Sequence, residues 1–197
     1  MDTYYTLAAP SEAVFTEKRS RFLSFAFPVS TREQAREEVR SISKEYFDAR
    51  HVCWAFMLGA ERLDFLSTDN GEPSGTAGKP ILGQINSYNL TDIIIIVVRY
   101  FGGIKLGTPG LIAAYREAAR MAIEAGEIVE CHRKELLEFT FPYLAMNDVM
   151  RIVKSADVEV LGQTFDNSCS MTLSMRADIF PEISGRILAI DGVTPRE

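Results

Sequence analysis

The sequence predicts an α+β protein with two domains, a larger one at residues 1–131 and a smaller one at residues 132–197. Three observations lead to this prediction. The chain has 197 residues, which is enough for two hydrophobic cores. Short apolar runs rich in β-branched residues alternate with segments of helical periodicity. From about residue 133 the predicted elements follow the order βαββαβ, which is the order of a ferredoxin-like domain.

The larger domain is predicted to begin with two strands, or one bent strand, followed by a helix. β-Branched and aromatic residues run through positions 11–30, with a basic interruption at positions 18–21. Ser30 or Thr31 is a suitable N-cap for the helix. Apolar residues then recur at helical spacing as far as Tyr46, so we expect this helix to be amphipathic.

Two buried strands of this domain each lead into a glycine-rich loop and then into a helix. The strand "HVCWAFMLGA" precedes the loop "DNGEPSGTAGKP" at positions 69–80, and Pro80 suits the first turn of a short helix. The strand "DIIIIVVRYF" runs into the second loop, "RYFGGIKLGTPG", at positions 99–110. Thr108 and Pro109 suit the N-cap and first helical position of an alanine-rich helix.

The smaller domain shows a different alternation of segments. A strand "RKELLEFTFPY" is followed by a helix "LAMNDVMRIVKSA", and then by a hairpin of "DVEVLGQTF" and "SCSMTLSMR" across "DNS". A second helix, "DIFPEISGRILAI", and a short strand, "GVTP", complete the pattern. We expect the boundary between the domains at positions 130–133.

The composition is that of a soluble globular protein, with 47% hydrophobic and 24% charged residues. A net charge of −6 rules out a basic field over the whole protein, so any contact with nucleic acid needs a local patch. No apolar run is long enough to span a membrane, and the N-terminus does not resemble a signal peptide. The three cysteines, Cys53, Cys131 and Cys169, are therefore expected to be reduced thiols in the cytoplasm.

The second glycine-rich loop has features suited to binding an anion. Glycines allow close backbone approach, the following helix start offers unpaired N–H groups, and two side chains carry positive charge. The candidate residues are Arg99, Gly102, Gly103, Lys105 and Gly107. The pattern matches neither a Walker loop nor a dinucleotide fingerprint. The alternative is a tight β–α turn in which Arg99 pairs with a carboxylate such as Glu72.

The first loop is a second candidate for anion binding, because its small residues can form a concave nest of N–H donors. Its candidate residues are Gly75, Thr76, Gly78 and Lys79. A purely structural turn explains the same residues equally well. A third alternative is that Asp69 and Glu72 bind a divalent metal or act as acid and base. We expect no metal and no cofactor.

Two further groups of residues lie near these loops in the sequence. His51 and Cys53 share one face of a strand, where a packed thiol and a hydrogen-bonded histidine are the simplest explanation. A nucleophilic cysteine or half of a zinc site are the alternatives. If His51 faces the loops, it is a candidate ligand contact. Lys18, Arg19 and Arg21 form a local basic cluster, which is either a solvated strand end or an extension of the anion site.

Four stretches, "EKRSRF", "ARHVCWAF", "DNGEPSGTAGKPI" and "VVRYFGGIKLGTPGLIAAY", resemble the YigZ/IMPACT family in order and spacing. The resemblance implies a first domain like ribosomal-protein and elongation-factor domains, for which we expect a mixed sheet with helices on one face. It also implies that the second, ferredoxin-like domain is similar to the last domain of elongation factor G. The family often has glycine where Pro109 stands, so the helix start has one N–H donor fewer here.

The resemblance implies a role in translation, because eukaryotic IMPACT proteins regulate translation by competing with a starvation-sensing kinase for its activator. We therefore expect a non-catalytic protein that binds RNA, the ribosome or a protein partner through the two loops. The alternative is an enzyme acting on a phosphorylated small molecule or nucleotide, with Ser74 and Thr76 at the phosphate. No membrane partner is expected, and the sequence leaves the oligomeric state open.

Overall fold

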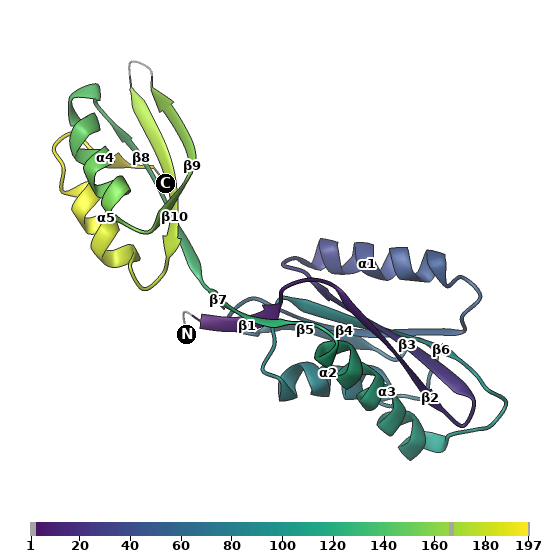
Figure 1. The fold of residues 1–197 in the computed structure, drawn as a ribbon. Helices are drawn as coiled ribbons and strands as arrows, with labels where there is room; N and C mark the ends of the chain where they lie inside the picture. The colour runs from purple at the N-terminus through teal and green to yellow at the C-terminus, as the bar shows by residue number, and fades with distance from the viewer. Residues whose placement is uncertain (1–2, 166–167, 197) are drawn as a thin grey trace. The chain divides into compact units, whose positions relative to one another are not determined.

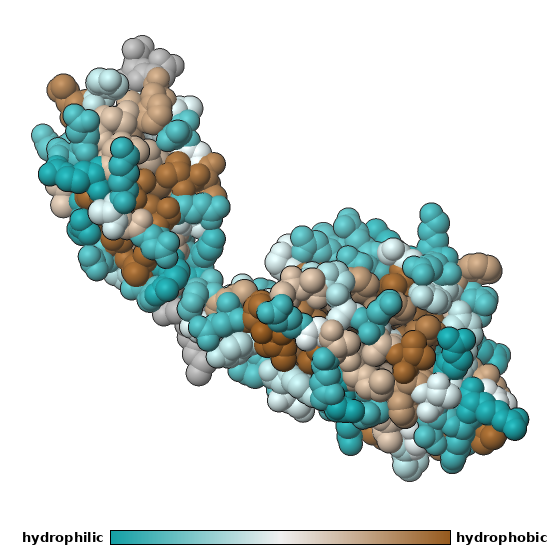
Figure 2. Space-filling model, in the orientation of Figure 1, coloured by the Kyte–Doolittle hydropathy of each residue, from teal (hydrophilic) through white to brown (hydrophobic). Residues whose placement is uncertain are grey.

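A computed structural model describes residues 3–165 and 168–196 of the chain (Figure 1). The chain forms two compact units, one from Thr3 to Cys131 and the other from His132 onwards. Each unit has its own hydrophobic core. On the face of each unit that Figure 2 shows, apolar residues lie between hydrophilic ones. No helix in the described part of the chain is long and apolar enough to cross a membrane.

The larger unit is built on a five-stranded sheet in which every neighbouring pair of strands is antiparallel. In spatial order the strands are β2 (Ser11–Glu17), β3 (Ser20–Pro28), β6 (Ile93–Tyr100), β4 (His51–Leu58) and β5 (Asp64–Thr68). A separate two-stranded sheet pairs β1 (Thr3–Leu7) with β7 (Ile128–His132).

Helices cover both faces of the five-stranded sheet, as Figure 1 shows. Helix α1 (Arg32–Glu45) packs on one face, while α2 (Gly78–Ser87) and α3 (Gly107–Glu124) pack on the other. The α+β class is confirmed, but the expected mixed sheet with helices on one face is wrong. The central strand β6 explains the difference, since residues 93–98 are all fully buried. Both faces of this strand are apolar, so each face needs a covering helix.

The smaller unit contains two helices and a four-stranded antiparallel sheet in the order β11-β8-β10-β9. Its elements are β8 (Lys134–Phe141), a 3₁₀ turn (Tyr143–Ala145), α4 (Met146–Ser155), β9 (Val158–Phe165), β10 (Cys169–Arg176), α5 (Phe180–Leu188) and β11 (Thr194–Pro195). This chain order, βαββαβ, is the ferredoxin-like one. The turn predicted across "DNS" includes positions 166–167, which lie outside the described residues.

Candidate functional site

The two glycine-rich loops meet at one end of the five-stranded sheet, where residues from both line a cleft of about 410 Å³. We call this the loop cleft. The first loop contributes Glu72 and Pro73, and Leu111 of α3 closes one side. The remaining lining residues come from the start of β4 and from the second loop; they are Arg50, His51, Arg99, Phe101, Lys105, Leu106, Gly107 and Thr108.

Arg99 is buried in the wall of the loop cleft and is paired with Glu72. Its Nη1 lies 2.7 Å from Glu72 Oε1, and the two side chains are only 7% and 3% exposed. The guanidinium also lies 5.6 Å from the ring centre of Phe22 and 5.7 Å from that of Phe101. Its Nε is buried and has no partner among the described residues. Arg99 therefore ties the second loop to the first.

Glu72 accepts a second hydrogen bond, from the buried hydroxyl of Tyr115 on α3 at 2.9 Å. The thiol of Cys53 lies 3.5 Å from the same hydroxyl and donates to the Asp69 carbonyl at 2.8 Å. Burial raises the pKa of Cys53 to about 12, so the thiol stays protonated at neutral pH. The arrangement matches the packed thiol expected from the sequence, and a protonated thiol is a poor nucleophile.

The N–H nest of the first loop is filled by a carboxylate of the same loop. Asp69 Oδ2 accepts from the Gly75 N–H at 2.7 Å, while Oδ1 accepts from Ala77 at 3.0 Å and Gly78 at 2.8 Å. Burial acts to raise the pKa of Asp69, but these three hydrogen bonds outweigh it and the pKa is lowered. The donors that the sequence suggested for an external anion are thus already engaged.

The other candidates in the first loop also lie away from the loop cleft. Thr76 is buried, and its hydroxyl donates to the Pro73 carbonyl at 2.6 Å. Gly75 and the exposed Lys79 line a separate shallow hollow with Arg116, between α2 and α3. Within the first loop, it is Glu72 and Pro73 that reach the loop cleft.

His51 does face the loops, at the point where β4 begins opposite Arg99. Its Nδ1 lies 3.1 Å from the Asn70 carbonyl oxygen, so the first loop fixes the orientation of the ring. Gly71, at φ +86°, passes the ring so closely that an added Cβ would lie 3.3 Å from Nδ1. His51 is therefore positioned by the first loop and remains available at the cleft wall.

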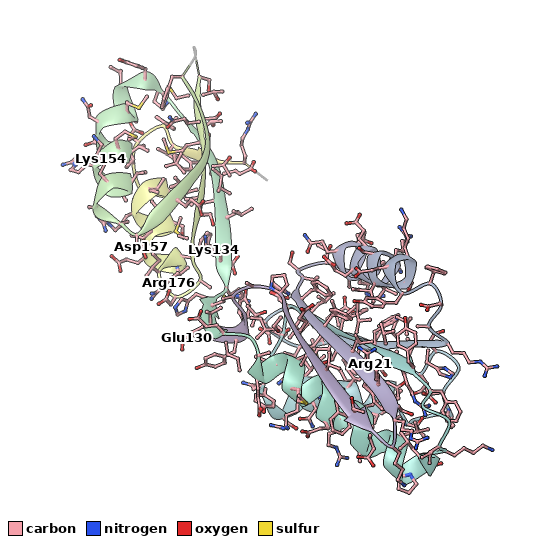
Figure 3. All side chains as sticks on the ribbon, turned by 45° about the vertical axis from the view of Figure 1, so that its right-hand side comes forward. Arg21, Glu130, Lys134, Lys154, Asp157 and Arg176 are labelled. Carbon is pink, nitrogen blue, oxygen red and sulfur yellow. The ribbon has the colours of Figure 1, made fainter. Side chains whose placement is uncertain are left out.

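The basic cluster adjoins the second loop. Lys18 and Arg19 occupy the turn between β2 and β3 with φ of +46° and +67°, and Arg21 pairs with Tyr100 across the sheet. All three are exposed, and Figure 3 shows Arg21 on its strand. The Gly102 N–H donates to Ser20 Oγ at 3.2 Å, and a Cβ at Gly102 would lie 2.0 Å from the Arg19 carbonyl carbon. Only glycine permits this approach.

The rest of the second loop is open to solvent. Gly103 and Gly107 have φ of +88° and +71°, and Lys105 is exposed with no ion-pair partner among the described residues. Helix α3 begins at Gly107 rather than after Thr108, and no side chain caps its first turn. Its start borders the loop cleft, so its unpaired N–H groups add partial positive charge there.

Phe101 and Arg50 are the aromatic and the charged contributors to this region that are absent from the candidates suggested by the sequence. Phe101 is 56% exposed although it lines the loop cleft, and Arg50 is exposed at the start of β4. The sequence feature that could have identified Phe101 is its position directly before Gly102 and Gly103. There the strand has ended, so no neighbouring strand covers the ring. An exposed aromatic ring beside cations is a suitable surface for stacking a base.

Comparison with known proteins shows to which protein family this chain is related. Residues 18–123 match the family model described as the Impact N-terminal domain, which is more than half of the chain. This chain belongs to the IMPACT family. The matched segment contains the basic cluster and both glycine-rich loops.

Two bacterial IMPACT relatives match over most of their length. An IMPACT family member of Haemophilus influenzae is 35% identical over 173 residues, covering 86% of this chain and 84% of the relative. The IMPACT family member YigZ of Escherichia coli is 31% identical over 193 residues, covering 95% and 93%. A crystal structure described as that of a hypothetical protein is 28% identical, with a TM-score of 0.79 over 99% of this chain and 97% of that one.

Proposed function

We propose that this IMPACT family protein is a non-catalytic, translation-associated binding protein that contacts RNA phosphates at one end of its larger unit. The contact surface consists of Lys18, Arg19, Arg21, Arg50 and Lys105, which we call the basic end surface. The observation that carries the proposal is the backbone approach between Arg19 and Gly102, because it brings the basic hairpin beside the second loop.

The charge distribution supports an electrostatic contact. The chain has a net charge of −6, yet the five side chains of the basic end surface are all exposed cations. The nearest carboxylate in the loop cleft, Glu72, is buried and neutralised by Arg99. A local positive patch on an acidic protein attracts phosphates while the remaining surface repels them. Phe101 is exposed and lines the same cleft as Arg50 and Lys105, so it offers a face for a base to stack on.

Arg99 has a positioning role in this proposal. A guanidinium that is 7% exposed and bound to a carboxylate has little charge left to offer a ligand. Its contribution is to hold Glu72, Phe101 and the start of the second loop in place. Lys105, His51 and the uncapped start of α3 then face the loop cleft, where one phosphate group would fit.

The link to translation comes from the family. The resemblance to eukaryotic IMPACT proteins, which regulate translation, favours RNA or the ribosome as the partner over a metabolite. Such a partner would place the protein in the cytoplasm. A protein partner at the same surface is the main alternative, and the experiment below separates the two.

The enzyme alternative has less structural support. Its phosphate site required donors from the first loop, but Thr76 and the N–H groups of Gly75 and Gly78 are bonded within the loop. Its acid–base candidates were Asp69, Glu72 and His51, but Asp69 fills the nest and Glu72 is paired with Arg99, which leaves His51 alone at the cleft wall. These contacts favour a structural role for the first loop.

Fluorescence anisotropy with a labelled 12-nucleotide single-stranded RNA tests the proposal. If four of the five cations contact phosphates at once, the slope of log K against log salt is about −2.8, which is about a 50-fold loss between 50 and 200 mM salt. The Arg19→Ala/Lys105→Ala variant should reduce the slope to about −1.4, because two of the four contacts are removed. Both side chains are exposed, so the fold should be unaffected.

The matched control is Arg116→Ala/Lys44→Ala, which removes two exposed cations from other parts of the same unit. It should bind RNA as the wild type does. Equal binding by the wild type and the Arg19→Ala/Lys105→Ala variant would contradict the RNA proposal. A protein that still co-purifies with the wild type after nuclease treatment, but does not co-purify with that variant, would instead favour a protein partner.

A further inference from the structure

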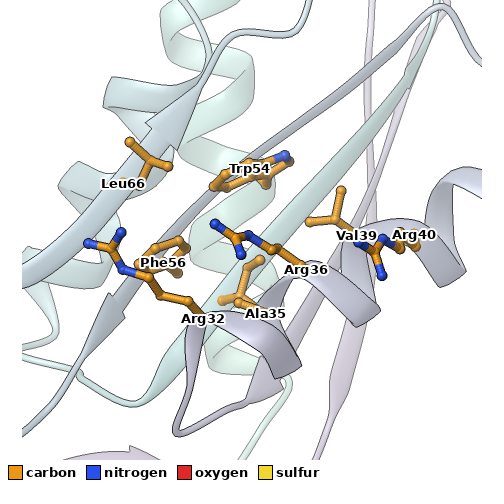
Figure 4. A pocket seen from close by; sticks show the side chains of 9 residues that line it. Arg32, Ala35, Arg36, Val39, Arg40, Trp54, Phe56 and Leu66 are labelled. Carbon is orange, nitrogen blue, oxygen red and sulfur yellow. The ribbon is translucent and has the colours of Figure 1, made fainter.

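A second groove lies on the α1 face of the five-stranded sheet and shares no lining residue with the loop cleft. It lies between α1 and the strands β4 and β5, and has a volume of about 330 Å³ (Figure 4). We call it the α1 groove. Its lining residues are Arg32, Ala35, Arg36, Val39, Arg40, Trp54, Phe56, Leu66 and Ile94.

The α1 groove exists because a single helix covers this face of the sheet. Five strands spaced about 4.8 Å apart span about 19 Å, whereas one helix is about 10 Å across. The other face carries two helices, α2 and α3, but here α1 lies over the central strands β4 and β6. The edge strand β5 is left without a covering helix on this face. Leu66 of β5 is consequently 51% exposed, and Leu63 just before it is 83% exposed.

The floor of the α1 groove is apolar and well ordered by packing. Trp54 and Phe56 stack with their ring centres 5.9 Å apart and their planes within 7° of parallel. Phe56 and Ile94 are buried, so they form a firm base, while Trp54 and Leu66 keep accessible surface. Partly exposed aromatic and aliphatic side chains in a groove gain free energy when a partner's apolar side chain covers them.

The α1 side of the groove carries three arginines together with Ala35 and Val39. Arg32, Arg36 and Arg40 lie at every fourth position of α1, so they form a row with a rise of about 6 Å between neighbours. Figure 4 shows this row along the helix, across from the strands that carry Trp54 and Leu66. None of the nine described residues that line the groove is acidic.

Most of this positive charge is not neutralised within the chain. Arg32 pairs closely with Asp64, through Nη2 and Oδ1 at 2.7 Å. Arg36 has a loose contact of 3.8 Å with Glu33 and its side chain is 63% exposed. Arg40 has no ion-pair partner in the described part of the chain. Two of the three guanidinium groups are therefore available to an external anion.

We propose that the α1 groove binds an acidic peptide segment of a partner protein. A bulky apolar side chain of the segment would fill the groove over Trp54 and Leu66, and its carboxylates would meet Arg36 and Arg40. Carboxylates one helical turn apart on a bound helix repeat at about 6 Å, which matches the arginine row. Arginine also binds carboxylates bidentately, which favours this chemistry.

The lining favours a peptide over nucleic acid. Apart from the arginines and the Trp54 indole, the side chains that line the groove are apolar, so they have no hydrogen-bonding groups for the edges of a base. A phosphate chain held by the arginines alone would leave the apolar floor uncovered. An acidic segment with an apolar anchor uses both features of the groove.

This site is independent of the proposed RNA contact. Side chains alternate along β4, so Trp54 lies on the α1 face and Cys53, beneath the loop cleft, lies on the face of α2 and α3. Failure of either proposal leaves the other unaffected, because the two surfaces share none of the residues on which they rest.

Trp54 is the sole tryptophan of the chain, so its indole N–H signal in NMR spectra and its fluorescence report directly on the groove. The probe is a synthetic 14-residue helical peptide with phenylalanine and leucine on one face and glutamates flanking that face. Titration into the full chain should shift the Trp54 indole signal and saturate. Arg36→Glu/Arg40→Glu should weaken binding at least tenfold, while Lys79→Glu/Arg116→Glu, an equal charge change on the face of α2 and α3, should not.

A matched peptide with lysine in place of every glutamate should fail to bind the wild type and should bind the Arg36→Glu/Arg40→Glu variant instead. An unchanged Trp54 signal with the acidic peptide at millimolar concentration would overturn the proposal. So would equal binding by the wild type and the charge-reversed variant. A single-stranded RNA that shifts the Trp54 signal in the wild type but not in that variant would overturn the choice of a peptide as occupant.

Discussion

The buried Arg99–Glu72 pair should behave as one structural unit whose halves cannot be removed separately. Arg99→Met leaves a carboxylate that is 3% exposed without its cation, and Glu72→Gln leaves a guanidinium that is 7% exposed without its anion. Removing one partner of a buried pair costs about 3–5 kcal/mol, because the remaining charge stays in a poorly solvated site. The double variant leaves neither charge, so it should be no less stable than either single variant.

Urea unfolding followed by Trp54 fluorescence measures this effect in the larger unit alone, since that unit holds the only tryptophan. With an m-value of about 2 kcal/mol/M, each single variant should lower the midpoint by about 1.5–2.5 M. The coupling energy from the double-mutant cycle should exceed about 2 kcal/mol. Single effects below about 1 kcal/mol that add independently in the double variant would refute the reasoning.

Three further predictions follow from single contacts. Gly102→Ala should lower the free energy of unfolding by about 3 kcal/mol, because its Cβ meets the hairpin backbone. Gly83→Ala lies in open space on α2 and should raise the free energy of unfolding by about 0.5–1 kcal/mol. Urea midpoints that move in the same direction in both variants would count against this. The lowered pKa of Asp69 stabilises the fold above pH 4 and ceases to do so as pH falls through the folded-state pKa. Asp69→Asn should therefore lower stability at pH 7 by about 2 kcal/mol and flatten the acid limb of melting temperature against pH; an unchanged limb would exclude this role. Iodoacetamide at pH 8 should modify Cys131 well before Cys53, whose pKa of about 12 and burial protect it; mass spectrometry showing the reverse order would be inconsistent with the structure.

Hydrophobic periodicity was enough to predict most of the elements from the sequence. The run at 93–98 is the central strand β6, and the βαββαβ order of the smaller unit appears as expected. Strand pairing was not predictable from the same patterns. A continuous apolar run shows that both faces of a strand are buried, but it does not show whether the neighbouring strands are parallel.

The loops show a different limit. Glycines indicated that the first loop bends its N–H groups inward, and Gly71 and Gly75 do have φ of +86° and +77°. Nothing in their spacing shows which anion fills the nest, and Asp69, within the same loop, is closest and needs no ordering of a second molecule. The pairing of Arg99 with Glu72 was one of the two alternatives that the sequence left open, and charge alone did not separate them.

Phe101 escaped sequence analysis because it continues an apolar strand by pattern, and its exposure follows from where β6 ends. Conversely, the relation of the basic cluster to the second loop depended on strand register, since β3 and β6 pair so that Arg21 lies opposite Tyr100. A register shift of one residue would place the cluster differently.

Ultraviolet cross-linking in cells, followed by mass spectrometry of peptides that carry a nucleotide adduct, tests the proposed RNA contact most directly. The account predicts adducts on the peptide containing Phe101 and on the hairpin peptide containing Arg19, and their loss in the Arg19→Ala/Lys105→Ala variant. Absence of adducts from the larger unit, or adducts confined to residues 132–197, would contradict it.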